Sequence, residues 1–188
     1  MKIYTKNGDK GKTSIIGESG LYKHDQRIDA YGTVDELNSY LGLLRSMPNI
    51  KETSYNDVII ELQKKLFKLG SYLAQSNYAT IKSENFLITE SEISHLEREI
   101  DKMSKQLPVL NSFVLSGGDM VSSHIQIART ICRRSERKLT IVHQKYKIHP
   151  IWLVFINRLS DFLFVFARYF AQKNGEKEHY WKGYNKSK

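Results

Sequence analysis

The sequence predicts an all-α fold, a five-helix bundle preceded by an extended N-terminal arm, and two observations carry this prediction. Five stretches place apolar residues at the spacing of an amphipathic helix, and no stretch shows a convincing strand pattern. Most connections between these stretches are short, which favours helices that pack as neighbours. The 188 residues are 40% apolar, enough for one domain with its own core.

We expect residues 1–27 to form a loop-like arm, because they are rich in Gly, Lys, Thr and Ser. Residues 5–14 read TKNGDKGKTS and bring backbone amides, hydroxyls and lysines together, a composition suited to wrapping phosphates. The segment is not a P-loop, since that pattern needs glycine six residues before Lys12, where this chain has Lys6. A flexible basic tail is the alternative interpretation.

The bundle is expected over residues 28–172, and its first helix over residues 28–46. The apolar stripe of this helix ends before Pro48, which cannot continue it. Asp35 and Asn38 share a line beside the stripe, whereas Glu36 lies elsewhere on the helix and is expected to be solvated.

The second helix is predicted over about residues 55–75, and the third starts after Thr89, where TESE resembles a capped helix start. A long polar connection joins these two helices. After the third helix, residues 107–118 form an apolar loop that ends in two glycines. Without further context, its Phe113 is more typical of a core side chain than of a functional one.

The fourth helix has four arginines within residues 128–137. Arg129, Arg133 and Arg137 follow one another at i, i+4 and i+8 along the flank of an apolar seam, with Glu136 beside them. An arginine row that touches the core calls for an anion to offset its desolvation, and guanidinium groups suit carboxylate or phosphate. A merely solvated basic face is the alternative interpretation.

The fifth helix, about residues 149–172, is nearly apolar all round, which indicates burial or a membrane span. Its polar residues argue against the span, because charges near the middle of a bilayer helix are costly. Asn157, Asp161, Phe164 and Arg168 form one polar and aromatic stripe that must meet polar groups in a buried place. The charged tail over residues 173–188 shows no motif.

The net charge of +9 predicts an anionic partner, without choosing among nucleotide, polyphosphate, nucleic acid and membrane surface. The single cysteine, Cys132, excludes an internal disulfide and fits a reducing compartment, and its place on the apolar seam indicates burial. The first residues lack the pattern of an export or organelle signal. We therefore expect a cytoplasmic protein.

Together, the basic arm, the arginine row and the polar stripe describe a pocket for a polyphosphate. Asp35, Glu136 and Asp161 are best interpreted as partners that fix the arginines, since buried arginines without partners are costly. The six histidines show no zinc or haem spacing, so we predict no metal site built by the protein. The apolar surface of the fifth helix also suggests an oligomer whose subunits share the polar site.

Four ordered segments carry a family resemblance: TKNGDKGKT at residues 5–13, AYGTVDELN at 30–38, CRRSER at 132–137 and FINRLSD at 155–161. Over nearly its whole length, the chain resembles the PduO-type ATP:cob(I)alamin adenosyltransferases. The resemblance implies a homotrimer of five-helix bundles with ATP bound between subunits. It also implies transfer of the 5′-deoxyadenosyl group of ATP to Co(I) of cobalamin or another corrinoid, which gives adenosylcobalamin and triphosphate.

The resemblance also implies roles for individual residues. Asp35 and Arg129 would form a salt bridge between subunits, Phe113 would exclude the lower axial ligand of cobalt, and Arg133 would act on the triphosphate. The implied ATP-binding residues are Thr5, Lys6, Gly8, Asp9, Thr13, Lys23, Arg133, Arg134, Glu136, Arg137 and Asn157. Mg²⁺ would bridge the phosphates. A corrinoid reductase or an adenosylcobalamin-dependent enzyme would be a further partner. Ser116 replaces a proline that relatives often have.

Two other functions remain alternatives. A basic helical nucleic-acid-binding module would use the same arginines on phosphates, but the chain has no recognised reader motif and no aromatic stacking platform. A regulatory protein that binds ATP or cobalamin without turnover would have the same binding residues. Of the three functions, we predict the adenosyltransferase, and with it no nucleic-acid partner and no membrane partner.

Overall fold

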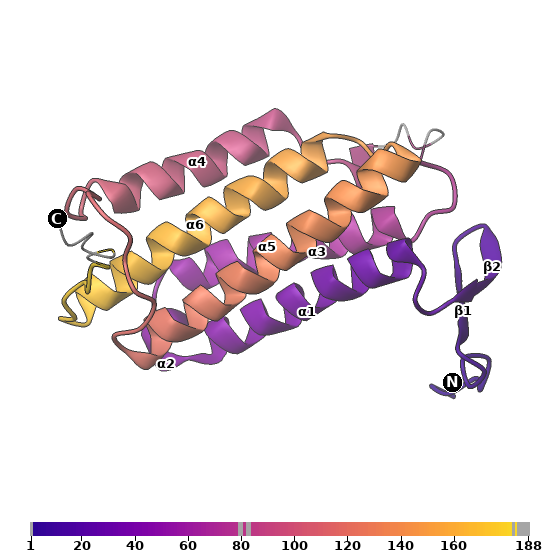
Figure 1. Ribbon diagram of the computed structural model, residues 1–188, viewed down its shortest axis with the longest axis horizontal. Helices are drawn as coiled ribbons and strands as arrows, with labels where there is room; N and C mark the ends of the chain where they lie inside the picture. The colour runs from indigo at the N-terminus through magenta and orange to yellow at the C-terminus, as the bar shows by residue number, and fades with distance from the viewer. Residues whose placement is uncertain (1, 79–80, 82–83, 182, 184–188) are drawn as a thin grey trace, which may run out of the picture.

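The computed structural model describes residues 2–78, 81, 84–181 and 183. This part of the chain is mostly helical, with six α-helices and one small antiparallel sheet of two strands. Five of the helices are long and lie side by side, and the sheet lies beyond one end of them (Figure 1). The elements are β1 (Lys12–Ile15), β2 (Glu18–Tyr22), α1 (Gln26–Ser46), α2 (Pro48–Lys51), α3 (Tyr55–Leu73), η2 (Glu84–Phe86), α4 (Glu90–Ser104), α5 (Met120–Tyr146) and α6 (Ile151–Lys173).

Side-chain caps set where three of the long helices begin. Asp25 accepts a hydrogen bond from Arg27 N at the start of α1, and Asp119 caps α5 in the same way. At α4, Thr89 and Glu92 form the reciprocal capping box that the sequence indicated. These caps satisfy backbone N–H groups that have no partner within the helix.

The core lies along α5 and α6, with α1 packed on α5, α3 on α1 and α4 on α6. Aromatic side chains of α6 fill much of it, and they include Trp152, Phe155, Phe162, Phe166 and Phe170. Cys132 of α5 is buried among them, as predicted, and burial raises the pKa of its thiol. Within the described ranges, none of the helices is both long and apolar enough to span a bilayer.

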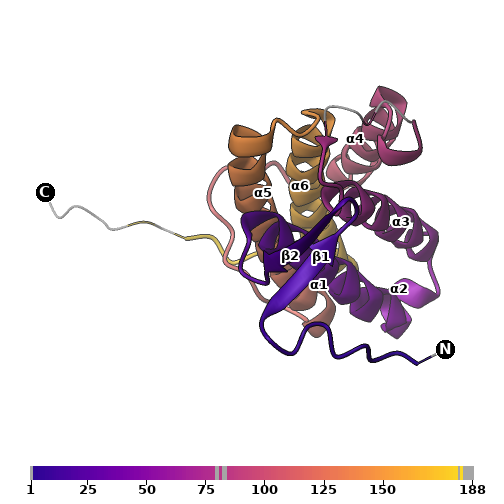
Figure 2. The ribbon, with the colours of Figure 1, turned by 90° about the vertical axis from the view of Figure 1, so that its right-hand side faces the viewer.

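The arm contains a β-hairpin, so the expectation of a chain without strands was wrong there. β1 pairs with β2, with an irregularity in the register between Thr13 and Ile15. The hairpin turns at Gly17, whose φ of +87° favours glycine, and Ile16 exchanges backbone hydrogen bonds with Ala74 and Ser76. Figure 2 shows the hairpin lying across the end of the helices. Contacts with a distant segment therefore stabilise strands that are too short and exposed to recognise locally.

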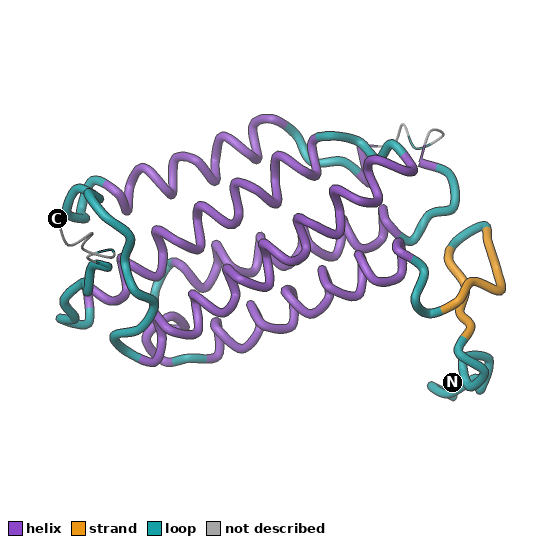
Figure 3. The backbone as a smooth tube through the Cα atoms, viewed as in Figure 1, coloured by secondary structure: helices purple, strands orange, loops and turns teal. Residues whose placement is uncertain are grey.

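The loop after α4 and the segment after α6 pack against each other. Gly175, with a φ of +81°, reverses the chain after α6, and Tyr180 then pairs with Val114 as an isolated antiparallel bridge. Figure 3 shows both segments as irregular backbone at the end of the molecule away from the strands. The segment from Gly175 to Trp181 thus packs on the loop after α4, and residues 182 and 184–188 lie outside the described residues.

Candidate functional site

The arginine row lies on α5, but only one of its members is partly buried. Arg133 and Arg137 are exposed, so the prediction that the whole row is desolvated was wrong for a single copy of the chain. Arg137 Nη1 donates to Arg133 O at 3.0 Å, and Arg129 Nε donates to Gln126 Oε1 at 2.6 Å. Burial and the neighbouring Arg133 lower the pKa of Arg129. None of the three arginines has an acidic partner among the described residues, so their charges are available to an external anion.

Polar residues next to the row connect α5 with the helices on either side. Glu36 of α1 is exposed to solvent, as expected, and it also forms an ion pair with Arg134. On the other side, Asn157 Nδ2 of α6 donates to Glu136 Oε1 at 2.9 Å. Glu136 therefore orients an amide, and among the described residues it forms no ion pair with an arginine of the row, so the expectation that it fixes an arginine was wrong for a single copy. Asp161 does fix an arginine, Arg158, at 2.8 Å.

Asp35 and Arg129 do not form a bridge within one copy of the chain. Asp35 is exposed and lines a groove of about 370 Å³ between α1 and α3, in which Phe67 is also exposed. In the described part of the chain Asp35 has no ion-pair partner, and the only side-chain hydrogen bond of Arg129 there goes to a residue of its own helix. Both charged groups are thus available to a second copy.

The arm places Lys6, Gly8 and Asp9 in a loop that Lys23 closes, whereas Thr13 lies in the adjoining strand β1. Asp9 N donates to Lys6 O at 3.3 Å, and Lys23 N donates to Gly11 O at 2.9 Å, which closes the loop. A Cβ at Gly8 would lie 3.1 Å from Lys23 Nζ, so the ammonium group packs directly on the glycine. Lys6 has a positive φ of 60°. Thr5, Lys6, Asp9 and Lys23 are exposed, and Gly8 and Thr13 are half-buried.

Arg27, which the sequence did not single out, fixes the arm to the helices. Its side chain is only 4% exposed, and it binds Glu18 of β2 at 2.7 Å and Asp25 at 3.2 Å. Its guanidinium also lies 4.9 Å from the centre of the Tyr146 ring at the end of α5. The hydrogen bond from Arg27 lowers the pKa of Glu18. In the sequence, Asp25 at a helix start followed by Arg27 could have indicated this pair. The spacing of residues could not have indicated Glu18 as a partner.

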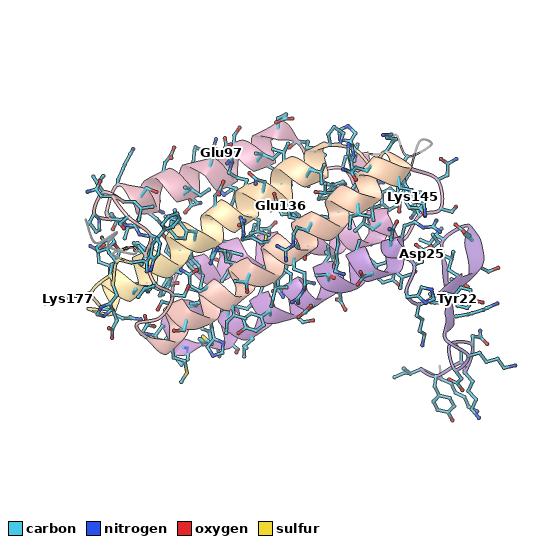
Figure 4. All side chains as sticks on the ribbon, viewed as in Figure 1. Tyr22, Asp25, Glu97, Glu136, Lys145 and Lys177 are labelled. Atoms are coloured by element: carbon cyan, nitrogen blue, oxygen red, sulfur yellow. The ribbon has the colours of Figure 1, made fainter. Side chains whose placement is uncertain are left out.

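The arm and the arginine row do not meet within one copy of the chain. Figure 4 places Tyr22 of the hairpin beyond the end of the helices and Glu136 over the body of the bundle. Lys177 lies at the opposite end of the molecule from Tyr22. The two cationic halves of the predicted pocket are therefore both present but apart.

Phe113 is 77% exposed, so the interpretation as a core side chain was wrong. Its ring lies edge-on to Trp181 at 6.3 Å between centres. Further apolar side chains of the loop and the tail are exposed as well, namely Val109, Leu110, Leu115, Tyr180 and Trp181. Next to Ser116, Gly117 and Gly118 have φ values of +142° and +104°. An exposed apolar surface of this kind on a folded chain indicates a ligand or partner site.

Comparison with known proteins identifies the family. Residues 3–170 match the family model for cobalamin adenosyltransferase. The chain belongs to the cobalamin adenosyltransferase family. The matched range of this adenosyltransferase includes the arm, the arginine row and Phe113.

The relatives of this adenosyltransferase are similar over most of their own length. It is 37% identical to a corrinoid adenosyltransferase of Bacillus subtilis over 179 residues, 93% of this chain and 89% of that protein. It is 38% identical to human corrinoid adenosyltransferase MMAB over 181 residues, 94% of this chain and 72% of that protein.

A solved structure also resembles the adenosyltransferase closely. This is a phenylalanine-to-alanine variant of the PduO-type ATP:corrinoid adenosyltransferase from Lactobacillus reuteri, in complex with cobalamin and ATP. Its TM-score is 0.89 at 38% sequence identity, covering 96% of this chain and 99% of that one. An arginine-to-lysine variant of the same enzyme in complex with ATP has a TM-score of 0.87 at 38% identity, covering 96% and 100%.

Proposed function

We propose that this adenosyltransferase binds the triphosphate of ATP between the arm of one copy and α5 of the next. The enzyme transfers the 5′-deoxyadenosyl group of ATP to the cobalt of cobalamin, as its family and its cobalamin- and ATP-bound structural neighbours support. One observation carries the shared site: the arginine row has no internal counterion among the described residues, and the cationic arm lies beyond the end of its own bundle. A second copy can bring its arm next to the arginine row, so that both sets of cations face one triphosphate.

We infer that the assembly is a homotrimer of bundles. If the arm of each copy contacts α5 of the next, the contact is head-to-tail, and such contacts close into a ring when the rotation permits. Asp35 and Arg129 support the same geometry, because neither has an oppositely charged partner in the described part of its own chain. In the ring, Asp35 of one copy would pair with Arg129 of its neighbour.

In the proposed reaction, Co(I) attacks C5′ of ATP. A Co–C bond forms with the electron pair of cobalt, the C5′–O bond breaks, and triphosphate leaves with the electrons of that bond. Arg133, Arg137 and Lys6 would stabilise the charge that develops on the leaving group, which is where fixed cations act most strongly. Lys23, Thr5 and Thr13 would hold the phosphates through the ammonium and hydroxyl groups, and Gly8 lets the backbone approach them.

The protein then contributes orientation and charge, because the corrinoid itself supplies the nucleophile. Glu136 and Asn157, which are joined by a hydrogen bond, would orient the nucleotide. Arg134 would also bind the nucleotide, once its ion pair with Glu36 has broken. Mg²⁺ fits this site as a companion of the phosphates. Asp9 is the carboxylate in the arm loop that can contact it, and the magnesium would otherwise keep water and phosphate oxygens.

The corrinoid would rest on the exposed apolar surface around Phe113. The Phe113 ring would occupy the lower face of cobalt, so that no lower ligand coordinates the metal. Loss of that ligand makes the cobalt easier to reduce, and a corrinoid reductase in the cytoplasm would deliver the electron. The product would pass to an enzyme that uses adenosylcobalamin.

An anaerobic assay tests the proposal. The purified protein is mixed with chemically reduced Co(I) cobalamin, ATP and Mg²⁺, and the corrinoid absorbance spectrum and free triphosphate are followed. We expect adenosylcobalamin and triphosphate in equal amounts. Binding of both substrates without conversion would instead support the regulatory alternative. Binding to random duplex DNA with a steep salt dependence, and none to ATP, would support the nucleic-acid alternative.

A further inference from the structure

The segment after α6 lies directly on the loop that bears Phe113. We call residues 176–181 the C-terminal strap and residues 107–119 the Phe113 loop. Leu115 N donates to His179 O at 2.8 Å, and Trp181 N donates to Phe113 O at 2.8 Å. Ser112 Oγ donates to Trp181 O at 3.0 Å. The strap therefore holds the backbone on both sides of Phe113. It also lies beyond residues 3–170, which match the family model.

A buried ion pair fixes this strap to the body of the bundle. Arg168 of α6 is 7% exposed, and the Glu178 side chain of the strap is 11% exposed. Two hydrogen bonds join them, Nε to Oε1 at 2.5 Å and Nη2 to Oε2 at 3.2 Å. Arg168 Nη2 also donates to Pro108 O at 2.9 Å, at the start of the Phe113 loop. One side chain thus holds the strap and the loop at the same time.

The surroundings of Glu178 favour its charged carboxylate form. Burial acts to raise the pKa of Glu178, but hydrogen bonds from Arg168 and Tyr180 outweigh it and keep that pKa below its ordinary value. Two parallel hydrogen bonds between guanidinium and carboxylate fix direction as well as distance. Removal of the carboxylate charge would leave Arg168 buried without its counterion, which is costly.

Contacts with the helices fix the two ends of the Phe113 loop, through Arg168 at Pro108 and through Ser122 at Gly117, whereas the strap holds its middle. Phe113 is largely exposed, and Gly117 and Gly118 give the backbone after it a wide conformational range. At residues 113 and 115, the backbone hydrogen bonds go to the strap. A Cβ at Gly118 would lie 3.5 Å from Glu176, so the strap packs closely at this end of the loop too.

We propose that Arg168 and Glu178 are positioning residues for the corrinoid reaction, because they lock the strap that sets the place of the Phe113 ring. The inference rests on the proposed role of Phe113 at the lower face of cobalt. Neither residue of the pair touches the reacting atoms. Their effect passes through the strap to Phe113, and it acts on the corrinoid and not on ATP.

The test uses Glu178→Gln in the full chain, with Glu97→Gln as the matched control. Glu97 pairs with Arg158 of the same helix α6 at 2.9 Å, so the control also removes one carboxylate from an arginine of α6. We expect Glu178→Gln to raise the KM for cobalamin about tenfold, the effect of one lost charge-assisted contact, with the KM for ATP unchanged. Glu97→Gln should leave the KM for cobalamin and the KM for ATP unchanged.

A spectroscopic measurement separates positioning from loss of stability. Co(II) cobalamin is added with ATP, and its electron paramagnetic resonance shows whether a lower nitrogen ligand remains on cobalt. The wild type should lose that ligand, Phe113→Ala should retain it, and Glu178→Gln should retain it in a substantial fraction. In the double variant Phe113→Ala/Glu178→Gln, the fraction of cobalt that retains the lower ligand should equal that in Phe113→Ala alone, because both changes act through the Phe113 ring.

The possible results separate the role of Phe113 from that of the ion pair. If the wild type keeps its lower ligand, the proposed role of Phe113 fails and the positioning role falls with it. If the wild type and Phe113→Ala behave as expected but Glu178→Gln behaves like the wild type, only the positioning role is refuted. The positioning role is also refuted if Glu178→Gln raises both KM values equally, or if its effect adds to that of Phe113→Ala.

Discussion

Mixing two inactive variants tests whether neighbouring copies share the site. The first variant, Lys6→Ala/Lys23→Ala, removes the arm cations, and the second, Arg133→Ala, removes a cation of α5. Each alone should lose about 10²-fold or more in turnover, as expected when donors to a developing charge are removed. Each variant keeps intact the half that the other lacks, because the two halves lie apart in one copy.

The size of the recovery follows from the geometry. In a ring of head-to-tail contacts, each site takes its arm from one copy and its arginine from the neighbour. When the variants are produced together in equal amounts, half of the arms and half of the arginines are intact. About one quarter of the sites then combine two intact halves by random association. The unfractionated mixture should therefore show about a quarter of wild-type turnover per chain. Purification through both tags removes trimers of a single variant, and each mixed trimer of the proposed ring has one intact site of three, so the purified protein should show about a third.

The assay is co-expression of the two variants with different affinity tags, followed by purification through both tags and the anaerobic spectral measurement. Mixing the same two proteins after separate purification, without subunit exchange, is the control and should give no recovery. A mixed assembly as inactive as its parents would mean that arm and arginine act from the same copy, which would refute the shared site.

Three further predictions concern single groups. Arg133→Ala should lower turnover about 10²-fold with the oligomer retained, whereas Arg158→Ala, an arginine away from the site, should stay near wild type in the same assay. Asp35→Asn should raise the subunit dissociation constant about five- to tenfold in sedimentation experiments, since it removes one charge of the proposed bridge. The hydrogen bond from Arg27 lowers the pKa of Glu18, so it gives stability that is present above the ordinary carboxyl pKa and lost as the pH falls through the lowered pKa of the folded protein. Hydrogen exchange of the hairpin should accelerate in that window.

Each of these predictions has a contradicting result. Near-normal turnover in Arg133→Ala would place the triphosphate elsewhere. Unchanged assembly of Asp35→Asn on dilution would remove the bridge from the interface. An Arg27→Met variant should show fast exchange of the hairpin already at pH 7, and slow exchange would mean that other contacts hold the arm.

The helices could be predicted because their signal is local. Apolar spacing, the cap at Thr89 and the helix stop before Pro48 placed α1, α3 and the start of α4 to within a few residues, since helix hydrogen bonds join residues close in sequence. The hairpin could not be predicted in this way. Ile15 is the one buried residue of β1, and the contacts that fix the turn come from Ala74, far along the chain.

The sequence predicted which residue types could bind phosphate, but it did not predict which groups surround them. A row of arginines beside an apolar seam has the same spacing whether a carboxylate, a phosphate or water faces it. For that reason, the exposure of Arg133 and the pairing of Glu36 with Arg134 could not be foreseen. The polar stripe of α6 was expected to meet polar groups in a buried place; this is confirmed for Arg168 and was wrong for Asn157 and Asp161, which are exposed. Glu178, the partner of Arg168, lies across the turn at Gly175, which no helical spacing describes.

The charges of Arg129 and Arg133 on α5 couple the proposed assembly to nucleotide binding. Burial lowers the pKa of Arg129 first and repulsion from Arg133 lowers it further, so a lone copy holds two cations that oppose each other on α5. In the proposed ring, the Asp35 carboxylate of the neighbour would pair with Arg129 and act against both causes by raising its pKa. Arg133 would then remain as the uncompensated charge that attracts the triphosphate. Linkage requires the converse as well: if assembly favours ATP binding in this way, ATP must strengthen assembly by the same factor.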